Sequence, residues 1–138
     1  MLKLGHQGTH EIVVTEELLA KRIGSGRVGV FATVMMIAGM EACAVESVQP
    51  FLDEGYTTVG TRVNVTHEAA TPLGMRVRFT SELIEISENG RQLRFQVAAY
   101  DEAGLIGQGM HERVIVNTQK FERKTFEKPS WRNQQVTR

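Results

Sequence analysis

Three residues have side chains that could carry proton or acyl transfer, and Glu41 is the clearest of them. It stands in the middle of Val28–Val48, the longest apolar run of the chain. An ionised carboxylate among Met, Ala and Cys side chains is unfavourable unless it is paired or hydrogen-bonded. If it is buried there, it is suited to act as a general base. The alternative is that Glu41 lies on a solvated stripe of a helix, and the residue alone does not decide between the two.

His67 and Thr33 are the other two candidates. His67 ends a β-branched run and precedes a loop, in the segment VTHEAATP, where an imidazole could reach a cleft and carry a proton. It could equally be an ordinary surface histidine. Thr33 lies near the start of a predicted helix. Its hydroxyl either caps that helix or holds a water or substrate group, or acts as a nucleophile.

The spacing of Thr33 and Glu41 limits how they could cooperate. They are eight positions apart, which in one helix is about 12 Å along the axis on roughly the same face. Their side chains therefore cannot touch within one chain. Either Thr33 precedes the helix, or the two act on different parts of one substrate, or a second subunit brings them together.

The remaining polar motifs are weaker signals. Arg113 could bind a phosphate of a ligand, or it could be a solvated charge on a sheet face. Gly107-Gln108-Gly109 interrupts the last β-type run, which indicates a bulge or a close backbone approach. Cys43 has no basic neighbour in the sequence and is expected to pack in the core as an inert thiol. The four histidines lack metal-ligand spacing, so no metal is expected.

Composition narrows the class of protein. The 138 residues suit one domain with a core, and sixteen basic residues balance sixteen acidic ones, which disfavours a nucleic-acid partner. A single cysteine excludes an internal disulfide and favours a reducing compartment. The N-terminus lacks the apolar core of a signal peptide, and carboxylates interrupt the longest apolar run. We therefore expect a cytoplasmic protein that does not enter a membrane.

The elements that must position these residues follow from the pattern of apolar residues. A short strand is predicted at His10–Thr15, a helical turn follows through Ala20, and Gly24-Ser25-Gly26 breaks regular structure. The central helix is placed at Thr33–Val48, with Pro50 marking its end. Four long β-type runs come next: Tyr56–His67, Arg76–Ser87, Gln92–Asp101 and Ile106–Gln119.

Short turns between these runs predict antiparallel pairing in a four-strand meander, with Asn89-Gly90 as the strongest hairpin signal. The predicted fold is therefore α+β, a hotdog fold in which a curved antiparallel sheet wraps around one central helix. Residues 1–138 form one such domain, with a polar tail from about Lys120. One copy would leave a sheet edge and part of the helix poorly covered, so we expect a homodimer formed through edge strands.

Several motifs of the chain closely resemble the fluoroacetyl-CoA thioesterase family of hotdog proteins. They are Phe31-Ala32-Thr33, Gly39-Met40-Glu41-Ala42-Cys43, Gly60-Thr61, the segment VTHEAATP at 65–72, and Gly109-Met110-His111-Glu112-Arg113. The similarity runs from about Val28 to Phe121. In the family's namesake the segment before the helix is longer and carries phenylalanines that form a lid over the acyl group. Lys21–Arg27 is short and has no aromatic residue.

The resemblance implies hydrolysis of an acyl-CoA thioester to free acid and CoA. The short segment without aromatic residues favours a short acyl group in general over fluoroacetate specifically. It implies Thr33, Glu41 and His67 as catalytic residues, and Gly60, His67 and Arg113 as substrate-binding residues. No cofactor is implied, because CoA is part of the substrate. Two alternatives are an enoyl-CoA hydratase or dehydratase on the same fold, and a non-catalytic acyl-CoA binding module.

Overall fold

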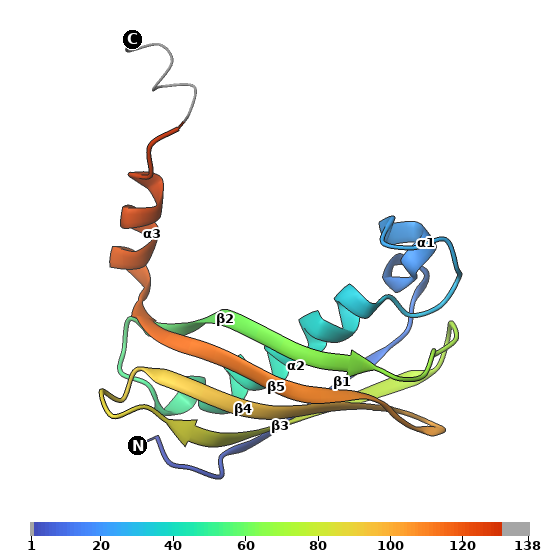
Figure 1. Cartoon of the computed structure of the whole chain (residues 1–138), viewed down its shortest axis with the longest axis horizontal. Helices are drawn as coiled ribbons and strands as arrows, with labels where there is room; N and C mark the ends of the chain where they lie inside the picture. Colours follow the sequence, from blue (N-terminus) through green and yellow to red (C-terminus); the bar gives the residue numbers. More distant parts are fainter. Residues whose placement is uncertain (1, 131–138) are drawn as a thin grey trace.

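A five-stranded antiparallel sheet curves around one long helix, as the sequence predicts (Figure 1). The structure is a computed structural model and describes residues 2–130. The strand order is β1-β3-β4-β5-β2. The strands are β1 (Gln7–Val13), β2 (Tyr56–His67), β3 (Arg76–Ile86), β4 (Gln92–Asp101) and β5 (Gly104–Asn117). The long helix is α2 (Thr33–Val48), and three short helical segments flank it: η1 (Glu16–Leu18), α1 (Ala20–Ile23) and η2 (Gln49–Phe51).

Helix α2 begins and ends at the predicted residues because its apolar side chains recur at helical spacing. Met36, Met40, Cys43 and Ala44 form the face that packs on the sheet, and all four are buried. Gly39 lies on this face beneath the Phe79 ring of β3, where even a methyl group would overlap the ring. The opposite side of the helix keeps an exposed stripe that includes Val34, which is 46% exposed. One copy of the chain therefore leaves part of the helix uncovered, as expected.

The predicted meander is wrong in one connection. β2 pairs with β5 at one edge of the sheet, whereas β3 pairs with β4 and with β1. The link from β2 to β3 is not a hairpin, because its backbone bonds to other segments: Thr71 O accepts from Phe31 N (2.9 Å) and Gly74 N donates to Val14 O (2.8 Å). These bonds carry the chain across to the β1 edge. The turns at Asn89-Gly90 and 101–104 are hairpins, as predicted.

Several ends of the predicted elements differ from the structure. Strand β5 starts and ends two residues before the predicted Ile106 and Gln119, and β3 ends at Ile86, one residue early. The first strand is β1 at Gln7–Val13, which starts before the predicted His10 because its earlier residues pair with β3. The polar tail begins as a helix, α3 (Thr118–Phe126), whose first turn is capped by the Asn117 side chain accepting from Lys120 N at 3.0 Å. Residues 131–138 of that tail lie outside the described part of the chain.

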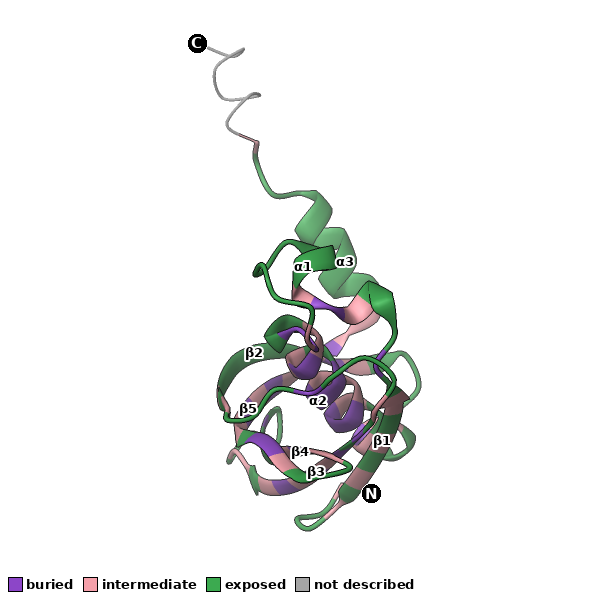
Figure 2. Ribbon diagram, turned by 90° about the vertical axis from the view of Figure 1, so that its right-hand side faces the viewer, coloured by how far each residue is buried: buried purple, intermediate pink, exposed green. Residues whose placement is uncertain are grey.

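The two edges of the sheet are β1 and β2, and the β2 edge is the more open. Residues 60–64 of β2 are exposed, among them Val63 at 39%. Helix α3 has no buried residue and stands clear of the sheet, as Figure 2 shows. Within residues 2–130, no helix is both long enough and apolar enough to cross a membrane.

Candidate active site

Thr33 and His67 meet at one end of the molecule. Thr33 is the first residue of α2 and His67 is the last residue of β2, and Thr33 Oγ1 lies 2.7 Å from His67 Nδ1. The N-cap of α2 is Ala32, so the Thr33 hydroxyl does not cap the helix and bonds the imidazole instead. With the imidazole proton on Nε2, the hydroxyl donates to Nδ1. The pair then has the arrangement of a hydroxyl nucleophile and its base.

The His67 ring is half-buried, and its environment favours the neutral form. Burial lowers the pKa of His67 below its ordinary value of 6.5, and the nearby backbone of Ala69 opposes this in part. Its Nε2 atom is buried and has no hydrogen-bond partner within residues 2–130. At neutral pH the imidazole can therefore take up a proton from Thr33. Its Nε2 remains the polar atom open to a further interaction.

A groove opens beside this pair. It has a volume of about 370 Å³ and is lined mainly by small and apolar side chains, including Val28, Val30 and Val34. Thr33 and His67 lie on its wall, and the loop after Gly24 forms another side. A groove of this kind suits an apolar acyl chain whose carbonyl carbon lies at the Thr33 hydroxyl.

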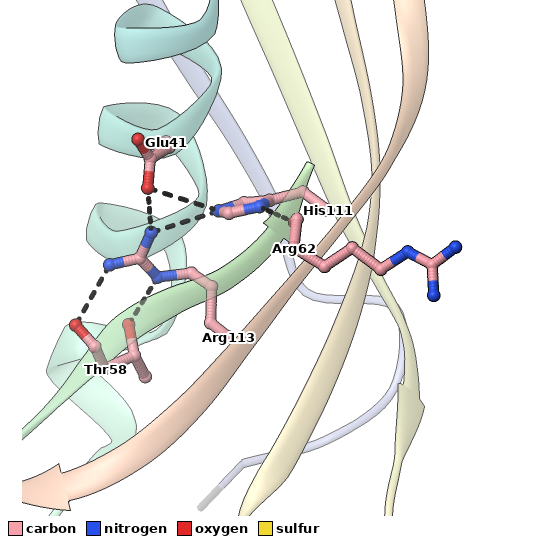
Figure 3. A network of polar contacts seen from close by, with 5 residues as sticks. All are labelled: Glu41, Thr58, Arg62, His111 and Arg113. Atoms are coloured by element: carbon pink, nitrogen blue, oxygen red, sulfur yellow. Dashed lines mark hydrogen bonds and ion pairs between the residues drawn. The ribbon is translucent and has the colours of Figure 1, made fainter. Parts of the chain in front are cut away.

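Glu41 lies in a second cluster two turns along α2, and its exposure is intermediate between the buried and the solvated alternatives. Its side chain is 41% exposed, because the open β2 edge covers it on only one side. Its Oε2 atom accepts from Arg113 Nη1 at 3.2 Å (Figure 3). Gly60 on β2 gives the carboxylate room, since a Cβ at Gly60 would lie 2.5 Å from Oε2. Glu41 is therefore a half-exposed, ion-paired carboxylate held against the sheet.

Arg113 points into the molecule and not toward solvent. The residue is 7% exposed, and its guanidinium donates from Nε to Thr58 Oγ1 (2.7 Å) and from Nη2 to Thr58 O (2.9 Å), besides the bond to Glu41. In this position it is not a solvated sheet-face charge, because its Nε, Nη1 and Nη2 atoms all donate to groups of the same chain. The geometry makes Arg113 the residue that orients Glu41 (Figure 3).

His111 completes this second cluster and was missed by the sequence reasoning. Its Nδ1 donates to the Arg62 carbonyl at 2.7 Å, which leaves Nε2 to accept from Arg113 Nη1 at 3.0 Å. Burial is the main reason that the pKa of His111 is lowered, so the ring is neutral beside Arg113. The sequence could have indicated His111, because it lies two residues from Arg113 on one strand and the two side chains therefore share a face.

Within one chain the candidate residues form two groups. Thr33 and His67 are together, and Glu41, Gly60 and Arg113 are together. No hydrogen bond or ion pair in the described part of the chain joins Glu41 to Thr33 or His67. The structure thus keeps Thr33 inside the helix and removes the first of the three options left by the spacing.

Two other predicted features, the close approach at the glycines of β5 and the packing of Cys43, are observed. Gly107 and Gly109 allow close approach, since a Cβ at Gly107 would lie 2.5 Å from Thr66 O and one at Gly109 would overlap Asn64 O. Cys43 is buried, and burial raises the pKa of its thiol, as expected for core packing. Residues 2–130 contain no cluster of three or more His, Cys, Asp or Glu that could hold a metal ion.

Comparison with known proteins shows the family of this chain. Residues 14–119 match the family model described as fluoroacetyl-CoA-specific thioesterase. The fluoroacetyl-CoA thioesterase of Streptantibioticus cattleyicolor is 35% identical over 133 residues, covering 92% of this chain and 94% of that protein.

Solved structures of thioesterases also resemble this chain. A structure of the fluoroacetyl-CoA thioesterase superposes with a TM-score of 0.87 at 34% identity, covering 94% of this chain and 99% of that one. A thioesterase superfamily member from Thermus thermophilus superposes with a TM-score of 0.83 at 33% identity, covering 92% and 93%.

The curved sheet around α2 and these relatives define a hotdog-fold thioesterase. Within that class, the chain belongs to the fluoroacetyl-CoA-specific thioesterase family.

Proposed function

We propose that this protein hydrolyses short acyl-CoA thioesters to the free acid and CoA. The observation that carries the proposal is the 2.7 Å contact between Thr33 Oγ1 and His67 Nδ1 on the wall of an apolar groove. Membership of the thioesterase family supports it, and a solved structure of the related enzyme is a complex with fluoroacetate and CoA. The groove wall includes Phe31 beside its valines, but Lys21–Arg27, the segment before the helix, has no aromatic residue to form a lid. We therefore take the substrate class to be short acyl groups in general.

In the proposed acylation step, Thr33 Oγ1 attacks the thioester carbonyl carbon and its proton passes to His67. The C–S bond breaks, and the CoA thiolate takes that proton as it leaves. The product is an ester of Thr33. The short contact between the hydroxyl and a neutral imidazole supports this assignment, because a hydroxyl needs an adjacent base to attack at neutral pH.

In the proposed deacylation step, Glu41 activates the water that hydrolyses the ester. Its carboxylate takes the water proton, and that proton then passes, with His67 as the relay, to the Thr33 oxygen as the C–O bond breaks, so that Glu41 and His67 both return to their starting forms. Arg113 keeps the carboxylate in one orientation through the 3.2 Å contact to Oε2. Within one chain Glu41 and His67 lie in separate clusters, so this step requires Glu41 of the partner subunit.

We infer that the partner is a second copy joined through β2. This edge strand is open, and Val63 on it and Val34 on the uncovered side of α2 are exposed apolar residues. Pairing two copies of β2 antiparallel would extend the sheet and cover that stripe of α2. An antiparallel arrangement also directs the Gly60 region of one subunit, with Glu41 beside it, toward the His67 end of the other.

A thiol-release screen over acyl-CoAs of increasing chain length tests the activity. We expect release from short saturated acyl-CoAs. An enzyme that consumes only enoyl-CoA without releasing thiol would be a hydratase, and binding of CoA esters without turnover would indicate a non-catalytic module. Either result would overturn the proposal.

Mixing two inactive variants tests the shared site. In a mixed dimer of Glu41→Gln and His67→Ala subunits, one of the two sites keeps both residues. If subunits pair at random, about a quarter of the wild-type rate should return. Each variant alone is the control. No recovery in a sample shown to contain mixed dimers would contradict Glu41 acting across the interface.

A further inference from the structure

The inward position of Arg113 leaves the phosphates of CoA without an assigned cation. A second groove, of about 690 Å³, lies where α3 leaves the sheet at the start of β2. Its polar and aromatic wall includes Tyr56, Arg91, Lys120, Phe121 and Lys124. The proposed hydrolysis steps do not use this groove.

This groove combines positive charge with exposed aromatic rings. Lys120 and Lys124 are one helical turn apart on α3, and Arg91 faces them from the β3–β4 hairpin. No carboxylate lines the groove, and within residues 2–130 neither lysine forms an ion pair with one. Tyr56 is 38% exposed and Phe121 is 43% exposed. Three cations beside two rings suit a ligand with several phosphates and a flat base.

The groove cannot serve the Thr33–His67 pair of its own chain. Tyr56 and His67 are the first and last residues of β2, and its 12 residues extend over about 40 Å at about 3.3 Å per residue. Figure 1 shows the two ends plainly: α3 projects past the β2 edge at the Tyr56 end, and α1 projects past it at the His67 end. A pantetheine arm is much shorter than this separation.

In an antiparallel dimer through β2, the groove of one subunit comes close to the Thr33–His67 pair of the other. The Tyr56 end of the partner's β2 then lies at the His67 end of the first, and the partner's α3 stands next to the α1 end. In the partner chain Tyr56 is only four residues from Gly60, or about 13 Å along the strand. That separation suits a pantetheine arm running from a thioester near Gly60 of the partner subunit to a nucleotide at the partner's α3.

We propose that the groove formed by Arg91, Lys120, Lys124, Tyr56 and Phe121 binds the phosphates and adenine of the CoA whose thioester is cleaved in the opposite subunit. This rests on the proposed function and on the proposed dimer. The cations contact the phosphates, and an aromatic ring stacks on the base. Each subunit thus supplies the nucleotide site for its partner's Thr33–His67 pair.

The first test compares two double variants of α3. Lys120→Gln/Lys124→Gln removes both lysines that line the groove. Arg123→Gln/Lys128→Gln removes two charges from the same part of the chain without altering the groove lining. For an acyl-CoA, the first variant should raise KM about tenfold with little change in kcat, as expected for two lost contacts to phosphate. The control should leave both constants near wild type.

The same acyl group on pantetheine, which lacks the nucleotide, separates binding from folding. With this truncated substrate the Lys120→Gln/Lys124→Gln variant should match wild type. An equal loss on both substrates, or no loss on acyl-CoA, would overturn the proposal. Direct titration with CoA and with adenosine 3′,5′-bisphosphate keeps the test independent of turnover. If wild type binds both ligands and the variant binds them about tenfold more weakly, nucleotide binding by the groove is supported even if no thioester is hydrolysed.

Mixed dimers test which subunit supplies the nucleotide site. One subunit carries His67→Ala with α3 intact, and the other carries Lys120→Gln/Lys124→Gln with His67 intact. The single functional site then uses the intact α3 of its partner, and KM for acyl-CoA should equal that of wild type. A raised KM in the mixed dimer would place the groove and the site in the same chain and would contradict the proposal.

Discussion

Replacing Gly60 with Ala should displace the Glu41 carboxylate without disturbing the backbone. Gly60 has no left-handed φ, so Ala can adopt its conformation. The new methyl group would lie 2.5 Å from Glu41 Oε2, where ordinary contacts begin near 3.4 Å. The carboxylate must therefore retreat by almost 1 Å. It can do so, because its side chain is 41% exposed, but its 3.2 Å contact with Arg113 is then lost.

The magnitude follows from these contacts. Displacing a catalytic group by about 1 Å costs on the order of a hundredfold in rate. Arg113 is 7% exposed and would lose its counter-charge. Because Glu41 is half-exposed, we expect the loss of this ion pair to lower the free energy of unfolding by about 1–2 kcal/mol. The assays are kcat for a short acyl-CoA and urea denaturation. His111 Cε1 and Arg113 Nη1, at 3.3 and 3.4 Å from the added methyl, need only small adjustments.

A double-mutant cycle isolates the cause. In a Glu41→Ala background the methyl group meets no carboxylate, so Gly60→Ala should then change stability by less than about 0.5 kcal/mol. Glu41→Asp shortens the side chain and should restore part of the stability lost in Gly60→Ala. If Gly60→Ala is equally destabilising with and without Glu41, the clash lies elsewhere and the argument for a positioned carboxylate fails.

Two further predictions concern Thr33 and pH. Thr33→Ala should lower kcat by about 10²-fold or more while Thr33→Ser keeps most activity, since only the hydroxyl is required; equal rates for the two variants, measured by thiol release, would remove Thr33 from the chemistry. Burial lowers the pKa values of His67 and His111. Below pH 6.5, the ordinary pKa of histidine, the unfolded chain therefore binds more protons at these two residues than the native chain does. The free energy of unfolding, from urea titrations, should therefore be fully present above pH 6.5 and decrease as pH falls through and below it. A flat profile from pH 7.5 to 5 would contradict neutral buried imidazoles.

Helix α2 and most strands could be predicted because their signals are local. The apolar run and Pro50 bound the helix, and strands β2 and β4 have the predicted ends. The strand order could not be predicted, because a short link between β2 and β3 is compatible with a hairpin or a crossover. The crossover depends on backbone bonds from the link to Phe31 and Val14, which are distant in sequence.

The candidate site could be predicted as a set of residues but not as an arrangement. The apolar sequence neighbours of Glu41 left open whether its side chain is buried or solvated, and the open β2 edge leaves it half-exposed. Alternation along β5 places His111 and Arg113 on one face, but the sequence does not tell whether that face is inside. The contact between Thr33 and His67 joins residues 34 positions apart and depends on where the helix start lies relative to the strand end.

The central claim is that the imidazole of His67 takes part in cleaving a thioester. The most direct measurement is the rate of thiol release from the best short acyl-CoA by wild type and by His67→Gln under the same conditions. We predict that wild type turns over and that the variant loses at least about 10²-fold in kcat, the usual contribution of a general base. Turnover by a folded His67→Gln variant at the wild-type rate would contradict the claim.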